Sequence, residues 1–488
     1  MTRSVQVRRG SYQDSVSLMQ VSRELQEREG VTSALVAMAT ELNLGLVADM
    51  GFEPPPESSP NDMLVAIDAE SDAAVDAAVA ALDAALVRRP PSDGGSGAGA
   101  VSPPTTIGAA ARRGEASLAL VSTPGAVAAI DAADAISAGL DVMVFSDNVS
   151  VAQEVALKDL AAAAGVLMMG PDCGTAVVGG VGLGFANVVR PGPVGIVAAS
   201  GTGAQHLLAL LDGAGIGVKH CLGVGGRDLS AVVGGRATLA ALDALDADDD
   251  ISTIVVISKP PAPEVAEAVT AHAEALGTPV VIGYLSPAHP DITVTAASVA
   301  RAMGQPWAPP ARWGATAPPA RTGYVRGLFS GGTLCDEAML IAVEQLATVS
   351  SNIALAGQPS LGARLESDGH TFIDFGDDRL TVGRAHPMID PTLRLQRLHK
   401  ELEDPDCAVV LLDVVLGNGA HPDPAAELVT AIAGSGTPVV VSLVGTRDDP
   451  QRLEDTASRL VAAGAIVHAS NSAAAREALA LVDRGKSA

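Results

Sequence analysis

Residues 195–207 read GIVAASGTGAQHL, a short apolar run that passes through Ser200-Gly201-Thr202-Gly203 into a segment with helical spacing of apolar residues. Such a run is typical of a strand buried on both faces, and the small residues allow a sharp turn into a helix. The first N–H groups of that helix would point outward, with the positive end of the helix dipole behind them. This arrangement predicts an anion site at the helix tip. Taken alone, one such turn is more often a plain helix cap.

The composition sets the class of protein. The chain has 488 residues, of which 48% are hydrophobic, and this length suits about two to four globular domains. Aromatic residues make up only 2%, so the cores must be built from Ala, Val, Leu and Ile, which favours an α/β fold with helices packed on sheets. The net charge of −25 opposes binding to nucleic acid or to an anionic membrane, and we expect neither as a partner.

The sequence lacks long apolar runs and paired cysteines, and this bears on where the protein is located and on how its cysteines are used. No run of about 18 apolar residues occurs, and the first residues lack the apolar run of a signal peptide, so we expect a cytoplasmic protein. The cysteines, Cys173, Cys221, Cys335 and Cys407, form no C-x-x-C pair, which disfavours a disulfide framework and a structural zinc site. In IDFGDD, the carboxylates Asp374, Asp377 and Asp378 supply no complete ligand set for a metal, and we expect them in turns and at the surface.

Two stretches rich in proline, glycine and serine interrupt the chain. RRPPSDGGSGAGAVSPPTT (88–106) predicts a flexible surface excursion, and GQPWAPPARWGATAPPART (304–322) predicts a stiffer linker between domains. On both sides of the linker, short apolar runs alternate with alanine-rich helical stretches. This alternation predicts doubly wound parallel sheets, whose ligands bind at the carboxyl ends of the strands.

The opening stretch has a counterpart after the linker. YVRGLFSGGTLCDEAMLI (324–341) repeats its order of short strand, glycine-rich turn and helix, with Ser330-Gly331-Gly332-Thr333 at the turn. Further matches follow in the same order: STIVVISKP with CAVVLLDVV, and GTPVVIGYL (277–285) with GTPVVVSLV (436–444). Two related domains whose helix tips converge would make a stronger anion site than one tip alone.

At this point the residues carry a family resemblance. GPDCGT (170–175), the opening stretch and GVGGRDL (223–229) resemble segments of the alpha subunit of succinyl-CoA synthetase, and the second half resembles the carboxyl-terminal part of its beta subunit. The chain is still more similar to the FdrA family, in which both parts lie on one chain. The segments that look like that family are RRGSYQDSVSLM, VFSDNV, ISKPP, DFGDD, VGRAHPMIDPTLR and LLDVVLGNGAHPDPA.

The resemblance implies a layout of domains. We expect a CoA-binding-like Rossmann domain over residues 1–190, a flavodoxin-like ligase domain over 191–303, and, after the linker, a second one over 323–488. In the synthetases, tips from two such domains face each other and stabilise a phosphorylated histidine. Carried over by position, the phosphate-binding residues are Ser200, Gly201, Thr202, Gly203, Ser330, Gly331, Gly332 and Thr333.

The chain departs from the synthetases where their histidine should lie. After TPVVIGYL it continues as SPAHPDITV, in which His289 lacks the flanking glycines of a G-H-A-G loop. No ATP-grasp domain precedes residue 323 either. We therefore do not expect a complete ATP-driven CoA ligase on this chain alone.

Two His-Pro loops supply candidates for catalysis. VGRAHPMIDP contains Arg384 and His386, and LGNGAHPDP contains His421. An arginine can hold a carboxylate or phosphate, and a histidine can transfer a proton near neutral pH. The alternative is that these prolines and charges only fix the loops. The remaining substrate-site candidates are Asp172, Cys173, Gly174, Gly417 and Gly419.

The amino-terminal VQVRRGSYQDS could meet the phosphates of a nucleotide. The candidates there are Gly10, Ser11 and Gln13, although the segment lacks G-x-G-x-x-G. CoA is therefore a possible cofactor, and no other cofactor is expected.

Two classes of function follow from the resemblance, and a third stays open. FdrA-type proteins are associated with a carbamoyltransferase complex of allantoin and purine breakdown, in which oxalurate is phosphorolysed to oxamate and carbamoyl phosphate. This reading implies partner subunits, phosphate or carbamoyl phosphate, and a small organic acid. The alternative is an acyl-CoA synthetase-like enzyme or a CoA-binding subunit. The third possibility is a scaffold whose partners contain the active site.

Overall fold

The computed structural model describes residues 2–11, 15–26, 28–53, 55, 58–59, 62–87, 104–289, 291–362, 364–381 and 384–483. The chain divides into two compact units. The first comprises residues 1–103 and 378–386, and the second comprises residues 104–377 and 387–488.

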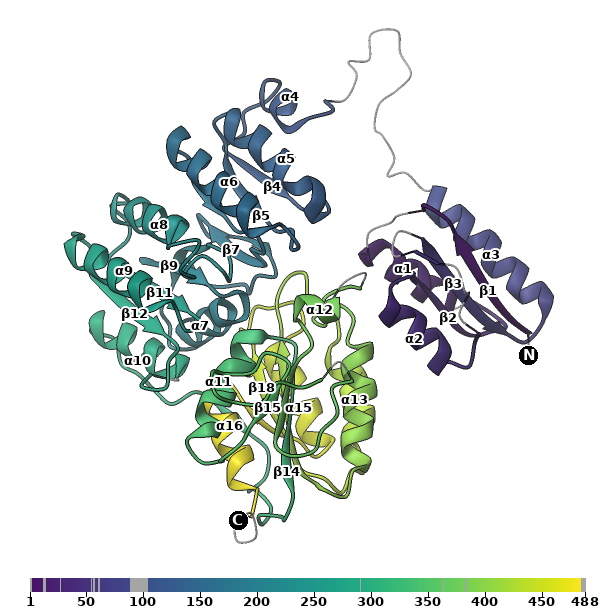
Figure 1. Cartoon of the computed structure of the whole chain (residues 1–488). Coiled ribbons are helices and arrows are strands. Elements are labelled where there is room, and N and C mark those ends of the chain that lie inside the picture. Colours follow the sequence, from purple (N-terminus) through teal and green to yellow (C-terminus); the bar gives the residue numbers. More distant parts are fainter. Residues whose placement is uncertain are drawn as a thin grey trace. The chain divides into compact units, whose positions relative to one another are not determined.

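The first unit is a small antiparallel sheet with helices, drawn in purple in Figure 1. Its sheet has the order β1 (Thr2–Arg8), β3 (Met63–Ala69), β2 (Val31–Met38), and both pairings of β3 are antiparallel. Its helices are α1 (Ser15–Gln26), α2 (Glu41–Asp49), α3 (Asp72–Val87) and, from the distant segment, α12 (Asp378–Thr381). Strand β3 is buried along its whole length, because it lies between the other two strands and is covered by apolar side chains such as Leu18 and Leu82.

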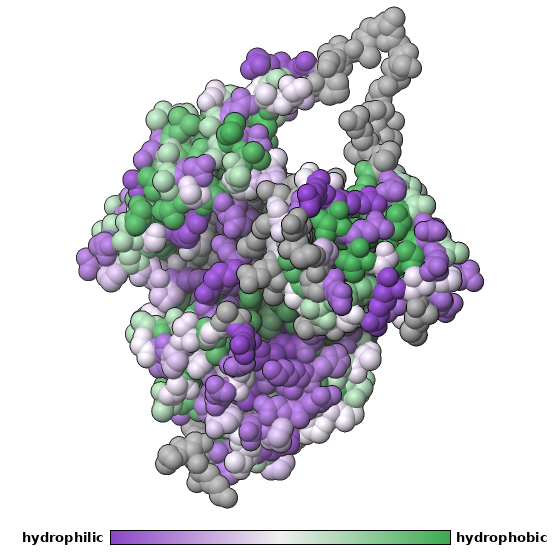
Figure 2. All heavy atoms as spheres, turned by 45° about the vertical axis from the view of Figure 1, so that its right-hand side comes forward, coloured by the Kyte–Doolittle hydropathy of each residue, from purple (hydrophilic) through white to green (hydrophobic). Residues whose placement is uncertain are grey.

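The second unit begins with a three-stranded parallel sheet. Its strands are β4 (Leu118–Val121), β5 (Asp141–Val144) and β6 (Met168–Met169), and its helices are α4 (Ile107–Ala111), α5 (Gly125–Ser137) and α6 (Val151–Ala164). Figure 2 shows hydrophobic side chains at the surface of this part. Ile130 of α5 is 69% exposed. The range 1–190, expected to be one Rossmann domain, thus contains two separate sheets and two strands, at 175–178 and 181–184, that belong to a third sheet. The physical reason is strand direction: β3 enters its sheet antiparallel, which a Rossmann crossover does not allow.

The next sheet has six strands and carries the opening stretch. Its order is β12 (Val280–Tyr284), β11 (Thr253–Ser258), β9 (Val194–Ala199), β10 (Val218–Gly223), β7 (Thr175–Val178), β8 (Val181–Gly184). The first four strands are parallel, and the β7–β8 hairpin adds to β10 in the antiparallel direction. The helices are α7 (Gly201–Gly213), α8 (Arg236–Asp246), α9 (Pro263–Ala275) and α10 (Ile292–Ala302).

The last sheet has seven strands. Its order is β13 (Arg312–Trp313), β19 (Ile466–His468), β18 (Val439–Val444), β17 (Cys407–Val415), β14 (Tyr324–Phe329), β16 (Thr371–Asp374), β15 (Ser350–Ser351). The helices are α11 (Gly332–Val343), α13 (Thr392–Glu403), α14 (Ala425–Ile432), α15 (Leu453–Ala462) and α16 (Asn471–Ala480). Part of the predicted linker is thus an edge strand, because β13 pairs antiparallel with β19.

The predicted α/β class with parallel sheets is confirmed. In both large sheets the apolar runs form central strands that are buried on both faces, as β9 and β17 show. Both predicted strand–turn–helix units are present, as β9–α7 and β14–α11. The described residues contain no helix that is long and apolar enough to cross a membrane.

Candidate functional site

The amino ends of helices α7 and α11 meet in the structure. Ser200 caps α7, because its Oγ accepts a hydrogen bond from the Gly203 N–H at 3.0 Å. The same Oγ lies 2.7 Å from Thr333 Oγ1. A methyl group at Gly331 would lie 2.6 Å from Thr202 Oγ1, so a glycine at this position allows the close approach. The two predicted turns therefore lie side by side.

The turn before α11 already holds an anion, a carboxylate of the protein itself. Asp413 in β17 accepts hydrogen bonds from the Ser330 and Gly331 N–H groups at 2.8 and 2.9 Å, and from the Ser330 hydroxyl at 2.8 Å. Arg394 Nη1 lies 2.6 Å from the same carboxylate, and Asp413 is fully buried. The Ser330 and Gly331 N–H groups are thus occupied, whereas Gly332 is partly exposed.

The turn before α7 is more open. Gly201 is exposed and Thr202 is partly exposed, while Ser200 and Gly203 are buried. The surface on which a ligand could meet both helix tips is therefore formed by Gly201, Thr202 and Gly332.

Strand register places two charged side chains beside these turns. Ser258 of β11 pairs with Ala199 of β9, so Lys259 follows next to the α7 turn. Asp374 of β16 pairs with Phe329 of β14, next to the α11 turn. Both side chains lie at the carboxyl ends of parallel strands, the edge where ligands bind in open α/β sheets.

Lys259, Asp336 and Asp374 form one charged cluster around Gly332, called the Lys259 cluster below. Lys259 Nζ lies 3.5 Å from Asp336 Oδ2. A methyl group at Gly332 would lie 2.6 Å from Asp374 Oδ2 and 2.9 Å from Lys259 Nζ. The Lys259 side chain is 37% exposed, so its ammonium can reach a ligand from solvent.

The cluster has shifted proton affinities. Burial raises the pKa of Asp374 to about 7, against the opposing effect of the Lys259 ammonium. Burial likewise raises the pKa of Asp336. For Lys259, burial alone would lower the pKa, but the Asp336 and Asp374 carboxylates outweigh burial and raise it. The cluster therefore combines a lasting positive charge with a carboxyl that can gain or lose a proton near neutral pH.

The sequence reasoning missed this cluster. Lys259 lies in STIVVISKP, whose repeat match and family resemblance give the lysine no role, and nothing in the sequence singles out Asp336. Asp374 was expected in a turn or at the surface, but it ends strand β16 and is 4% exposed. The usable signal was position, since both Lys259 and Asp374 lie at the carboxyl end of an apolar run.

The GPDCGT segment contributes one exposed carboxylate to the surroundings of the cluster. Asp172 has φ +57 and is exposed, and its charge helps to raise the pKa of Lys259. Cys173 is 2% exposed, and burial raises the pKa of its thiol, which disfavours the nucleophilic thiolate. Gly174 accepts a backbone hydrogen bond from Phe185 at 2.8 Å.

The loop after β17 is fixed from inside the protein. Gln451 accepts a hydrogen bond from the Gly417 N–H at 3.0 Å and donates to the carbonyls of Gly417 and His421 at 2.8 and 3.2 Å. His421 Nδ1 accepts a hydrogen bond from the Asp423 N–H at 3.1 Å, and Gly419 has φ +80. His421 is partly exposed, and proton transfer by its other nitrogen stays a prediction.

Arg384 and His386 belong to the other unit of the chain. There Arg384 Nε donates a hydrogen bond to Asn43 Oδ1 at 2.7 Å. The catalytic roles of Arg384 and His386 stay predictions.

Among the residues predicted to meet CoA, Gly10 has its backbone N–H bonded within the protein. The Gly10 N–H donates to Asp62 Oδ1 at 2.8 Å, and this bond and the bond from Ser59 lower the pKa of Asp62. The one backbone donor of Gly10 is thus already bonded to a carboxylate. The Ser11 N–H donates to Arg8 O at 3.4 Å, and Gln13 lies outside the described residues.

Known proteins place the chain in a family. The uncharacterized protein YahF of Escherichia coli (strain K12) is 38% identical over 510 residues, which cover 96% of this chain and 97% of YahF. The chain belongs to the YahF family. Models for "AllF, heavy metal-associated domain" and "CoA-ligase" match residues 1–103 and 328–481 of this YahF-family chain. The second match confirms the synthetase-like character expected after the linker, whereas the likeness to the FdrA family stays a prediction.

Solved structures similar to the YahF-family chain include two CoA-dependent enzymes. One is ATP citrate lyase from Methanothrix soehngenii in complex with citrate and coenzyme A, at 18% identity, covering 37% of this chain and 31% of that chain, with a TM-score of 0.33. The other is the dinucleotide-forming acetyl-coenzyme A synthetase 1 of Ca. Korarchaeum cryptofilum in complex with phosphate and ADP, at 15% identity, covering 78% and 85%, with a TM-score of 0.31.

In the described part of the YahF-family chain, no group of three or more His, Cys, Asp or Glu side chains is placed to hold a metal ion. All four cysteines lie after residue 103, outside the segment matched by the AllF model.

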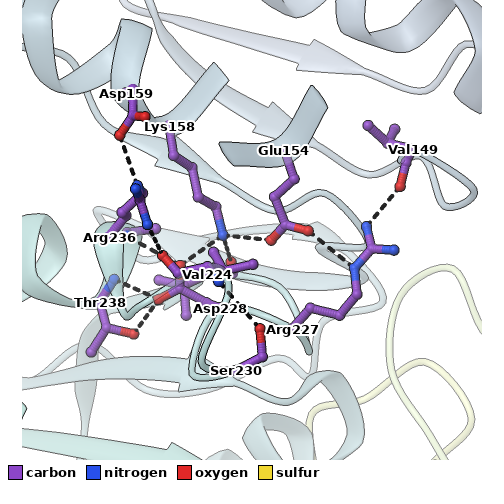
Figure 3. A network of polar contacts seen from close by, with 12 residues as sticks. Val149, Glu154, Lys158, Asp159, Val224, Arg227, Asp228, Ser230, Arg236 and Thr238 are labelled. Atoms are coloured by element: carbon purple, nitrogen blue, oxygen red, sulfur yellow. Dashed lines mark hydrogen bonds and ion pairs between the residues drawn. The ribbon is translucent and has the colours of Figure 1, made fainter. Parts of the chain in front are cut away.

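GVGGRDL has a structural role in this chain. Figure 3 shows Lys158 of α6 between Glu154 and Asp228, to which its Nζ donates at 2.8 and 2.7 Å. Arg227 donates to the other oxygen of Glu154 at 3.0 Å, and Thr238 donates to Asp228 through both its N–H and its hydroxyl. Glu154 and Asp228 are fully buried and Lys158 nearly so. This ion cluster joins the three-stranded sheet region to the six-stranded one.

Behind the helix tips lies a buried histidine. His206 of α7 is fully buried, its Nε2 accepts a hydrogen bond from the Asn471 N–H at 3.4 Å, and its Nδ1 has no partner among the described residues. Burial lowers the pKa of His206 to about 4, against a small opposing effect of Asp291.

Stability should therefore fall in mild acid because of His206. Its contribution is present above the unfolded pKa of about 6.5 and is lost as the pH falls through about 4, because only the unfolded state binds the proton readily. The full effect is on the order of 3 kcal/mol. Urea unfolding between pH 7 and 4 should show a flatter decline for His206→Leu than for the wild type. Replacement of the partly exposed His272 by Leu is the control. An equal dependence of the unfolding free energy on pH in all three proteins would contradict this assignment.

Proposed function

We propose that the chain is an acyl-CoA synthetase-like protein that binds the phosphoryl group of a small acyl phosphate between helices α7 and α11. The 2.7 Å contact between Ser200 Oγ and Thr333 Oγ1 carries this proposal, because it joins the two helix tips at one point. Two helix dipoles directed at one place favour an anion more than one does. The CoA-ligase match over residues 328–481 supports the synthetase-like reading.

The Lys259 cluster adds the charge that such a ligand requires. The ammonium can donate charge-assisted hydrogen bonds to phosphate oxygens, and these are stronger than hydrogen bonds between neutral groups. Gly332 leaves the space in which Lys259 and Asp374 approach the tip of α11. The Gly10 N–H, predicted to meet CoA, is already bonded to Asp62.

A carbamoyltransferase subunit acting on oxamate and carbamoyl phosphate is the second candidate. Carbamoyl phosphate is itself an acyl phosphate, so the same helix tips would serve it. The observation in its favour is the segment after β12, where His289 is exposed and has no glycine beside it, unlike the phosphorylated histidine of the synthetases.

The two candidates differ in their products. We would assay CoA thioester formation from organic acids, and phosphate release from carbamoyl phosphate with oxamate, each with and without the proteins encoded beside this chain. Thioester formation together with an acid-labile label from γ-labelled ATP would support the synthetase. Phosphate release without either would support the carbamoyltransferase.

Replacing Gly201 by Val should weaken phosphate binding. Gly201 is exposed at the first residue of α7, and the nearest atom to a methyl group there is Thr175 Oγ1 at 3.9 Å, so the new side chain fills the ligand's space without displacing the protein. Calorimetric titration with inorganic phosphate should show at least a roughly tenfold higher Kd, about 1.4 kcal/mol.

Gly213→Val is the matched control, because Gly213 is exposed at the far end of the same helix and a methyl group there meets nothing within 4 Å. This variant should bind phosphate as the wild type does. Equal affinity in both variants would place the phosphate elsewhere.

A further inference from the structure

Asp374 is a buried carboxyl with one oxygen that accepts no hydrogen bond from the described residues. Its Oδ1 accepts the Gly376 N–H at 2.9 Å, and its backbone N–H and C=O are both bonded to the Asn352 side chain, at 2.9 and 2.8 Å. The residue is 4% exposed. Its Oδ2 faces Gly332, where a methyl group would lie only 2.6 Å away. The oxygen without a donor is thus directed at the first residue of α11.

The neighbouring charges leave Asp374 without a full counter-charge. Lys259 lies 3.5 Å from Asp336, so its charge is largely matched by that carboxylate. A phosphate dianion at the helix tips would add negative charge beside Asp374 Oδ2. Two anionic groups that share a desolvated site cannot both stay ionised at neutral pH, and the weaker acid takes up a proton.

We propose that a phosphate dianion binds at the tips of α7 and α11 together with one proton, which adds to Oδ2 of Asp374. The inference rests on the proposed function and adds the proton to it. The proton comes from solvent, and the only bond formed is the O–H of the carboxyl. That O–H then donates a hydrogen bond to a phosphate oxygen, which the ionised carboxylate cannot do.

The groups around Asp374 agree with this assignment. Lys259 follows β11 and favours the ionised form, whereas Asp336 on α11 and Asp377 in the turn of Asp374 itself favour the protonated form. Cys335 on α11 is fully buried, and burial raises the pKa of its thiol, so it adds no charge. Burial has already raised the pKa of Asp374 to about 7, and a bound dianion raises it further.

Calorimetry with inorganic phosphate in two buffers of different ionisation enthalpy measures the protons taken up. We expect close to one proton per phosphate for the wild type at pH 8, and a Kd for the dianion that rises by up to about tenfold from pH 7.5 to 8.5. Asp374→Asn should bind phosphate with no proton uptake and with little change in Kd over the same range. Asn keeps the acceptor for the Gly376 N–H, and thermal melting checks its fold.

Asp336→Asn is the comparison, since this carboxylate lies 3.5 Å from Lys259 and is already paired with it. It should keep the proton uptake. Infrared difference spectra of the wild type, which need no variant, should show a protonated carboxyl appearing when phosphate is added. Phosphate binding by the wild type without proton uptake, or uptake lost only in Asp336→Asn, would overturn the inference and leave the proposed function standing. Absence of phosphate binding by the wild type would overturn both.

Discussion

Replacement of Lys158 by Met is expected to lower the free energy of unfolding by about 3–5 kcal/mol. The methionine fits the space of the lysine stem but supplies no charge, so Glu154 and Asp228 stay buried beside each other with one donor fewer each. The cost comes from the carboxylates left behind, since removing one partner of a buried ion pair leaves uncompensated charge. Urea unfolding followed by Trp307 fluorescence reports on this region, because Trp307 packs against the core of the six-stranded sheet.

Arg236→Ala is the control for Lys158→Met. Arg236 pairs with Asp159 at 2.7 Å in the same region, but the two side chains are 36% and 60% exposed. Solvent screens such pairs, and the expected loss is below about 1 kcal/mol. Equal losses in the two variants would show that the buried cluster contributes no more than a surface pair.

Replacement of Asp413 by Ala should destabilise the second unit by a similar amount, about 3–5 kcal/mol. The change leaves Arg394 without its carboxylate and leaves the Ser330 and Gly331 N–H groups without an acceptor. Each buried donor without a partner costs roughly 1–3 kcal/mol, and a buried guanidinium costs more. The midpoint of urea unfolding should shift to lower urea concentration.

Asp423→Ala is the comparison for Asp413→Ala. Asp423 forms two hydrogen bonds with Arg459, at 2.8 and 3.1 Å, but its side chain is 46% exposed. We expect a loss of at most about 1 kcal/mol. If Asp413→Ala unfolds at the same urea concentration as this control, the carboxylate in the α11 turn is not required for stability.

The parallel sheets could be predicted because their signals are local. The apolar runs at β9 and β14 and the glycine-rich turns after them each lie within one short segment of sequence. Both predicted strand–turn–helix segments are present as expected. The first unit could not be predicted in the same way. The apolar run of β3 does not show that it pairs antiparallel with β1 and β2, because strand direction depends on contacts between residues far apart in sequence.

The sequence indicated the two glycine-rich turns of the candidate site but not the side chains that bind to them. The family resemblance implies that the turns at Ser200 and Ser330 face each other, and in the structure Ser200 Oγ lies 2.7 Å from Thr333 Oγ1. The sequence could not reveal that the Asp413 carboxylate accepts hydrogen bonds in the second turn, or that the Asp62 carboxylate accepts one from the Gly10 N–H. A carboxylate that binds nearby N–H groups comes from another strand or loop, and only the folded chain brings the two together.

The hydrogen bond between Arg384 and Asn43 has a consequence for biosynthesis. It joins residues 341 positions apart, so the first unit includes a segment made long after its sheet. At the usual rate of synthesis of about 5–20 residues per second, a nascent chain would hold the sheet of residues 2–69 for roughly 16–63 seconds before Arg384 is added. During that interval Asn43 Oδ1 lacks the hydrogen bond from Arg384, while its amide nitrogen can already donate to Met38 O. We therefore expect the amino-terminal unit to mature late, although its sheet is synthesised before the second unit.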